Sequence, residues 1–149
     1  MKITGVAPKI AVPTFIYILI TVIIDYFTKP LFTITQKNYS AFIAIASILM
    51  LIGILAVARV GKKLRKSFSS GTLMNDGLYK IFRNPMYVSY LILIIPGICF
   101  LFNSWLVFTS LIINFILFQI FIKEEYKYLE EKYKEEYKSY LDKVLFKFL

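Results

Sequence analysis

Several residue types that enzymes commonly use are missing from this sequence. Its 149 residues include no histidine and a single cysteine, Cys99. The missing histidine excludes Ser-His and Cys-His nucleophiles, HExxH zinc sites and histidine-ligated haem. One cysteine can form neither an internal disulfide nor a thiolate metal site, so we predict no metal centre and a packing role for Cys99. No Walker A or GxGxxG pattern occurs, and any chemistry must therefore rest on the reactivity and positioning of a cofactor.

Charge is scarce as well, and the uncharged residues come in long blocks. Charged residues make up 18% of the chain, hydrophobic residues 58%, and the mean hydropathy is +0.68. Residues 84–122 contain no Lys, Arg, Asp or Glu, and a single membrane span needs only about 20 residues. Two spans must share this run, with the turn at Asn103-Ser104-Trp105. Shorter charge-free runs cover residues 10–24 and 38–58.

These runs predict an all-α polytopic membrane protein that forms one domain over residues 1–149. We expect four transmembrane helices and then a cytoplasmic amphipathic helix, at about residues 10–27, 39–60, 86–102, 105–123 and 124–146. Lys2 and Lys9 precede the first run as in a signal sequence, but no small-x-small cleavage pattern follows Ile24. The first span is therefore expected to be an uncleaved signal anchor.

Lys and Arg between the spans predict the orientation. The middle loop, between the second and third spans, carries seven of them. The connection between the third and fourth spans carries none, and the tail from Lys123 onward carries seven lysines. By the positive-inside rule, the middle loop, the tail and the N-terminus are cytoplasmic, as expected for the inner membrane of a bacterium or archaeon. The net charge of +9 is then explained by anionic lipid headgroups, and nucleic acid is not an expected partner. The oligomeric state cannot be predicted. The middle-loop residues are Arg59, Lys62, Lys63, Arg65, Lys66, Lys80 and Arg83.

The tail has the pattern of an amphipathic helix. Apolar and tyrosine side chains recur every three or four residues, and balanced Lys and Glu fill the other positions. This stripe can lie on the membrane or fold back over the cytoplasmic ends of the spans as a lid, and we favour the lid. It consists of Tyr126, Leu129, Tyr133, Tyr137, Tyr140, Val144 and Phe148.

Two polar clusters flank the last two spans. Asn84 and Pro85 suit the N-cap and first position of a helix, with Arg83 snorkelling to the interface; the same arrangement suits a bound carboxylate or phosphate. Glu124 and Glu125 either lie in solvent on a continuing helix or bind a ribose diol or an ammonium group. The residue types and their spacing do not decide between a helix cap and an anion site, or between solvated and ligand-binding glutamates.

Three further polar residues lie in or beside the apolar runs. Asn114 and Gln119 are expected to hydrogen-bond between helices. Gln119 lies within one turn of Lys123 and could instead face the cavity of the polar clusters. Asp25 is expected to pair with Lys29 near the opposite surface.

The second half of the chain contains Gly77-x-Tyr79-x-x-x-Arg83-Asn84-Pro85-x-Tyr87, then Glu124-Glu125, and then the tail run from Tyr133 to Tyr140. In order and spacing these motifs resemble the isoprenylcysteine carboxyl methyltransferase and phospholipid methyltransferase family. That family has a pattern G-x-Y-x-x-x-R-[HN]-P-x-Y, two spans, paired glutamates and a tail motif F-G-x-E-Y-x-x-Y. The resemblance covers about half of the chain, Leu73 to Tyr140, and is specific because several motifs co-occur around a two-span hairpin. The matching residues are Gly77, Tyr79, Arg83, Asn84, Pro85, Tyr87, Glu124, Glu125, Leu129, Tyr133, Glu136, Tyr137 and Tyr140.

The resemblance implies that S-adenosylmethionine is bound at the cytoplasmic surface. It implies that Arg83, Asn84 and Tyr87 hold the methionine portion and that Glu124 and Glu125 bind the ribose or amino group, with Arg83 and Glu124 as the catalytic pair. Tyr79 and Tyr126 would contact adenine. Two departures stand out: Asn84 replaces the more usual His, and Lys134 replaces a Gly.

Together these features indicate a membrane-embedded S-adenosylmethionine-dependent methyltransferase. Its expected acceptor is a lipid or a prenylated, isoprenylcysteine-like compound, methylated on a carboxylate or an amine. The alternatives are a non-catalytic assembly partner of the same fold and a sterol-reductase-like nicotinamide enzyme.

Overall fold

A computed structural model describes residues 5–147, so Lys2 and Phe148 lie outside the described part. Four helical stretches are long and apolar enough to cross a membrane. This confirms the predicted all-α, four-span architecture. The elements are α1 (Ala7–Thr28), α2 (Tyr39–Ser70), the 3-10 turn η1 (Gly77–Lys80), α3 (Pro85–Ser89), the π-helical segment η2 (Tyr90–Ile94), α4 (Ile95–Phe102) and α5 (Trp105–Lys143).

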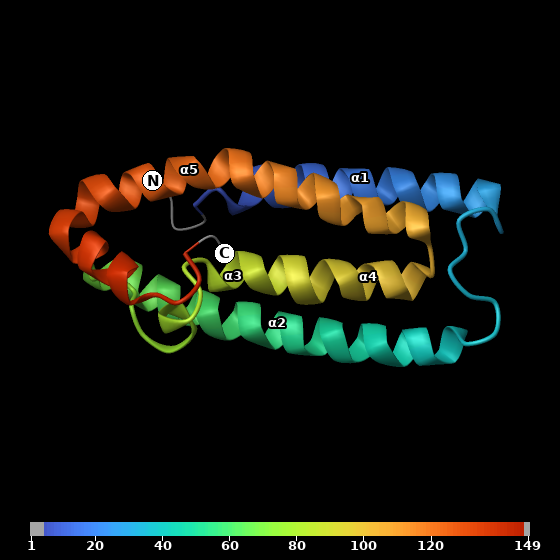
Figure 1. The fold of residues 1–149 in the computed structure, drawn as a ribbon, viewed down its shortest axis with the longest axis horizontal. Helices are drawn as coiled ribbons and strands as arrows, with labels where there is room; N and C mark the ends of the chain where they lie inside the picture. Colours follow the sequence, from blue (N-terminus) through green and yellow to red (C-terminus); the bar gives the residue numbers. More distant parts are fainter. Residues whose placement is uncertain (1–4, 148–149) are drawn as a thin grey trace.

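The spans form two antiparallel pairs. Figure 1 shows α1 lying along α5 and α2 lying along α4, with α4 also in contact with α5. The connection between α2 and α3 lies at one end of this bundle, together with the far part of α5 and the start of α1. We call this the loop end. At the opposite end, the amide of Trp105 donates to the carbonyl of Phe32 over 2.9 Å.

Two glycines let α2 approach the third span closely. A Cβ atom on Gly97 would lie 2.7 Å from Cγ of Met50, and one on Gly53 would lie 2.7 Å from Cγ1 of Ile94. Small residues at such contacts are typical of helix packing inside membranes. The third span is one rod of α3, η2 and α4, in which the π segment precedes Pro96 of α4. A π segment is a common way to accommodate the missing proline N–H.

Inside the bundle, one predicted polar contact is confirmed. Asn114 Nδ2 on α5 donates to Thr14 Oγ1 on α1 over 2.9 Å. Cys99 is fully buried, as expected of a packing residue.

Two other polar predictions are wrong. Asp25 is buried and accepts a 2.6 Å hydrogen bond from Ser104 Oγ, and among the described ion pairs none joins it to Lys29. It faces the start of α5, whereas Lys29 follows the end of α1 and is exposed. Gln119 is exposed on α5, and among the hydrogen bonds of residues 5–147 none joins its side chain to another helix. It does not line the cavity described below either.

Both long helices continue beyond the predicted bilayer segments. We expected the second span to end near residue 60, but α2 continues to Ser70, because Lys and Arg are good helix formers once the chain has left the apolar layer. The predicted fourth span and tail helix form one element, α5, which ends at Lys143 instead of residue 146. Within α5 the backbone turns sharply at Lys134, with φ 42° and ψ −114°.

After this kink, residues 135–147 return over the loop end, and we call them the lid segment. Tyr137, Tyr140 and Val144 are buried against Leu73. The lid segment also adds backbone hydrogen bonds, including Phe146 N to the Ile81 carbonyl at 2.8 Å. Figure 1 shows the lid segment folded back over the loop end. The described residues of the predicted stripe are buried or partly buried, as expected of a lid and not of a helix lying on the membrane.

Candidate functional site

A cavity of about 390 Å³ lies under the lid segment at the loop end of the bundle. This volume falls within the range of about 300 to 1,000 Å³ that small-molecule sites occupy. Its walls come from parts of the chain that are far apart in sequence. They include Ala7 and Pro8 of α1, Arg65 of α2, Arg83 of the connecting loop, Tyr87 of α3, Glu125 of α5, and Tyr137 and Tyr140 of the lid segment.

Most of the predicted site residues meet at this cavity. Tyr79, Arg83, Asn84, Tyr87 and Glu125 line it. Tyr126 lies next to this wall, in contact with two of its members. Glu124 is not brought to the cavity.

Arg83 is held firmly by two aromatic residues of α5. Its Cζ lies 3.2 Å from the ring centroid of Tyr126, and its Nη2 and Nε donate to Tyr137 Oη over 2.6 and 3.1 Å. Among the ion pairs of residues 5–147, none includes Arg83. Its positive charge is therefore positioned by neutral groups, which leaves it available to a carboxylate or phosphate ligand.

Asn84 occupies the predicted N-cap position of α3, followed by Pro85 at the start of the helix. The side chain of Asn84 makes no capping hydrogen bond to the helix. Instead, Asn84 Nδ2 donates to Tyr126 Oη. Tyr126 thus contacts both Arg83 and Asn84, and the nearly buried Asn84 amide braces the wall of the cavity.

The two adjacent glutamates have different surroundings. Glu125 Oε2 accepts hydrogen bonds from Tyr87 Oη at 3.0 Å and from the amide of Val6 at 3.5 Å. Glu124 Oε2 pairs with Lys9 Nζ at 2.5 Å, and both of these side chains are 52% exposed. Successive residues of an α-helix point about 100° apart, so one glutamate faces the cavity and its neighbour faces outward.

Tyr79 adds a neutral hydroxyl group to the cavity. Burial, followed by the nearby charge of Glu125, raises the pKa of Tyr79 above its ordinary value. Its phenol therefore remains protonated at neutral pH and can donate a hydrogen bond. Its backbone carbonyl accepts a 2.9 Å bond from Tyr140 Oη, which ties it to the lid segment.

Sequence reasoning missed part of the wall. Tyr133, Tyr137 and Tyr140 line the cavity, although their spacing indicated only the apolar stripe of an amphipathic helix, either on the membrane or in a lid. The spacing of these tyrosines along the helix was the signal that could have placed them in the cavity wall. Arg65 and the first turn of α1 carried no comparable signal, because their position depends on how α1 and α2 pack.

Comparison with known families gives a match that covers most of this site. The model of a family described as phospholipid methyltransferase matches residues 38–136. That stretch includes Arg83, Asn84 and Glu125 and leaves out α1. No curated protein and no solved structure matches this chain.

Proposed function

The chain belongs to the phospholipid methyltransferase family, and from that membership we propose that it transfers a methyl group from S-adenosylmethionine to a lipid acceptor at the cytoplasmic membrane surface. The observation that carries this proposal is the composition of one cavity. Arg83, which has no ion pair among residues 5–147, and the carboxylate of Glu125 line it together with several tyrosine rings.

These groups match the parts of S-adenosylmethionine. The guanidinium of Arg83 would bind the methionine carboxylate, and Glu125 would accept hydrogen bonds from the ribose diol or the ammonium group. Aromatic rings such as Tyr79 suit the flat adenine base. We keep Glu125 and not Glu124 in this assignment, because Glu124 pairs with Lys9 outside the cavity.

Such a reaction needs positioning more than proton transfer. When bound, S-adenosylmethionine supplies an electrophilic sulfonium methyl group, and methyl transfer to an amine or carboxylate is an in-line displacement. The protein's task is then to align the two reactants and exclude water. Arg83 and Asn84, braced by Tyr126, would orient the donor, and Tyr137 and Tyr140 of the lid segment would cover it. A site without histidine can perform this task.

We also infer how the protein is oriented in the membrane and which class of compound accepts the methyl group. With the loop end in the cytoplasm, the polar donor would enter from the aqueous side, and the acceptor would arrive from the bilayer between the spans. An amine or a carboxylate on a lipid or a prenylated thiol would serve as acceptor. One membrane domain over residues 1–149 would suffice.

The test is methyl transfer by the full chain reconstituted in lipid vesicles. S-adenosylmethionine carrying a labelled methyl group is supplied with total lipids or with a prenylated thiol acid, and the organic extract is counted. We expect label in the lipid fraction, and loss of this label in Arg83→Ala. The proposal would be overturned by a folded protein that labels neither acceptor. Binding of reduced nicotinamide dinucleotide by the same preparation would favour a reductase instead.

A further inference from the structure

The end of the lid segment pairs with the loop that precedes α3. The amide of Phe146 donates to the carbonyl of Ile81 over 2.8 Å, and the amide of Arg83 donates to the carbonyl of Phe146 over 3.1 Å. The rings of Phe82 and Phe146 stack with their centroids 5.3 Å apart. The end of the lid segment is therefore held beside residues 81–83.

This pairing gathers exposed apolar side chains outside the spans. Leu145, Phe146 and Ile81 are 71%, 47% and 40% exposed, and we call them the loop-end apolar patch. From Glu124 to Lys143, by contrast, the apolar and tyrosine side chains of α5 are buried or partly buried. Adjacent exposed apolar side chains commonly mark a surface that contacts a partner or a membrane.

Three helices show where the apolar layer of the bilayer ends on this side. Towards the loop end, the first charged residue is Lys9 on α1, Arg59 on α2 and Lys123 on α5. Lys9 pairs with Glu124, so α1 and α5 leave the apolar layer at the same level. These residues mark the boundary between acyl chains and headgroups.

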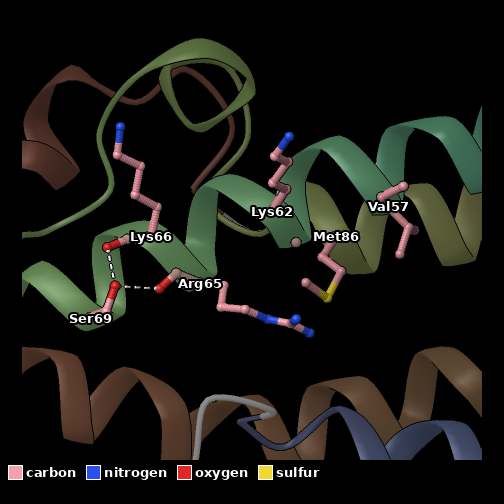
Figure 2. A pocket seen from close by; sticks show the side chains of 8 residues that line it. Val57, Lys62, Arg65, Lys66, Ser69 and Met86 are labelled. Carbon is pink, nitrogen blue, oxygen red and sulfur yellow. Dashed lines mark hydrogen bonds between the residues drawn. The ribbon is translucent and has the colours of Figure 1, made fainter.

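The third span begins at this boundary. Figure 2 shows Met86 of α3 beside the part of α2 where Val57 gives way to basic residues. Asn84 donates to Tyr126 Oη, and Tyr126 lies less than one helical turn beyond Lys123. The loop-end apolar patch is built on the residues just before Asn84 and their pairing partners, so it lies at the level of the headgroups.

Basic residues flank the patch. Lys143 and Lys147 are exposed, and among the ion pairs that the structure describes none includes either of them. Asp142 is their acidic neighbour. Earlier in the lid segment, by contrast, Lys138 pairs with Glu135 at 2.9 Å. Apolar side chains beside unpaired lysines are typical of segments that lie in the surface of an anionic membrane.

We propose that the end of the lid segment is an interfacial membrane anchor. The loop-end apolar patch inserts among the headgroups of the leaflet at the loop end, and Lys143 and Lys147 contact anionic headgroups. The lid segment is then fixed at both of its ends, by the kink at Lys134 and by the bilayer. This proposal does not rest on methyl transfer or on what occupies the cavity.

Insertion can be measured by spin-label accessibility on the full chain in vesicles of phosphatidylcholine and phosphatidylglycerol. The label is attached to Leu145→Cys in a Cys99→Ser background. Ser139→Cys, exposed earlier in the lid segment, is the matched control, and Ile120→Cys, 57% exposed inside the fourth span, gives the value for the bilayer. The readout is the ratio of collision rates with oxygen and with a water-soluble nickel chelate. We expect this ratio to be about fivefold higher at position 145 than at position 139, because an apolar layer excludes polar solutes.

The two lysines are tested with the label at position 145. Lys143→Gln/Lys147→Gln should lower the ratio by about twofold or more in the anionic vesicles and leave it unchanged in phosphatidylcholine alone, because the lysines act on anionic headgroups. Lys138→Gln is the control, since Lys138 already has an acidic partner, and it should leave the ratio unchanged in both.

Three outcomes would count against the anchor. Equal ratios at positions 145 and 139 would overturn it. Low collision rates with both reagents at position 145 would show that protein covers the patch, and would contradict a membrane partner. An effect of Lys138→Gln as large as that of the double variant would contradict the contact of Lys143 and Lys147 with headgroups. These samples contain no methyl donor, so their outcome is independent of the proposed function.

Discussion

The guanidinium group of Arg83 donates two hydrogen bonds, of 2.6 and 3.1 Å, to the hydroxyl oxygen of Tyr137. Arg83 precedes α3, whereas Tyr137 belongs to the lid segment beyond the kink of α5. The placement of the charge that we assign to donor binding therefore depends on the closed position of the lid segment. Several measurements can test this dependence and the rest of the site.

Replacement of Tyr137 by Phe should loosen Arg83 without removing its charge. The variant keeps the aromatic ring but loses the acceptor of both hydrogen bonds. Because hydrogen bonds to charged groups are worth about 1.5 to 3 kcal/mol, we expect S-adenosylmethionine to bind roughly tenfold more weakly in calorimetry. Tyr39→Phe is the control, since its hydroxyl donates to the Leu101 carbonyl and Tyr39 does not line the cavity. Equal affinities of the two variants would argue against a role for the Arg83–Tyr137 contact.

The adjacent glutamates should respond differently to the same substitution. Glu125→Gln removes the carboxylate charge from the cavity, and we expect donor affinity to fall by about tenfold or more. Glu124→Gln removes only an exposed ion pair with Lys9, and such pairs contribute about 0 to 1 kcal/mol. Its donor affinity should remain within about twofold. If Glu124→Gln instead proves the more damaging change, our choice of Glu125 is wrong.

Replacement of Lys134 by Gly should stabilise the protein. Lys134 has a φ of 42°, a region that costs non-glycine residues of the order of 1 to 3 kcal/mol. Part of this gain is offset by the greater freedom of glycine in the unfolded chain. We expect a net gain of about 1 kcal/mol, measured as a higher thermal midpoint in detergent. Lys134→Ala should show no gain, and a lower midpoint for the Gly variant than for the Ala variant would contradict the kink.

The loop end should lie on one side of the membrane. Single cysteines at positions 66 and 138, each in a Cys99→Ser background, lie on α2 and on the lid segment at that end. An impermeant thiol reagent applied to sealed cytoplasmic-membrane vesicles of known orientation should label both positions from the cytoplasmic face. Labelling from opposite faces would contradict the four-span arrangement, and labelling of both from the outer face would contradict our orientation alone.

Sequence reasoning located the spans because the length of a charge-free run is limited by bilayer thickness. Residues 84–122 are too long for one span, and the polar break at Asn103 became the turn between two. In the structure Asn103 adopts a positive φ of 52°, which asparagine tolerates better than most residues. By contrast, the same charge counting could not place the end of α2, because a helix does not need an apolar run outside the bilayer.

The finer geometry of the site could not be predicted from spacing. Glu124 and Glu125 belong to the same motif, and only the rotation of α5 against α1 decides that Glu125 faces Val6 and the cavity. Lys134 is an ordinary helix former, so its intrinsic preference gives no sign of a kink. The resemblance to a family with Gly at this position was the one indication that the backbone turns there.

The most direct test of the central claim is calorimetric titration of S-adenosylmethionine into the wild-type chain and Arg83→Ala, both in lipid nanodiscs. Lys80→Ala, an exposed neighbour that does not line the cavity, serves as the control. We predict saturable binding to the wild type and to Lys80→Ala, and a loss of about 2 to 4 kcal/mol of binding free energy in Arg83→Ala, because a charge-assisted contact is removed. Wild-type affinity in Arg83→Ala, or no binding to a folded wild-type chain, would contradict the account.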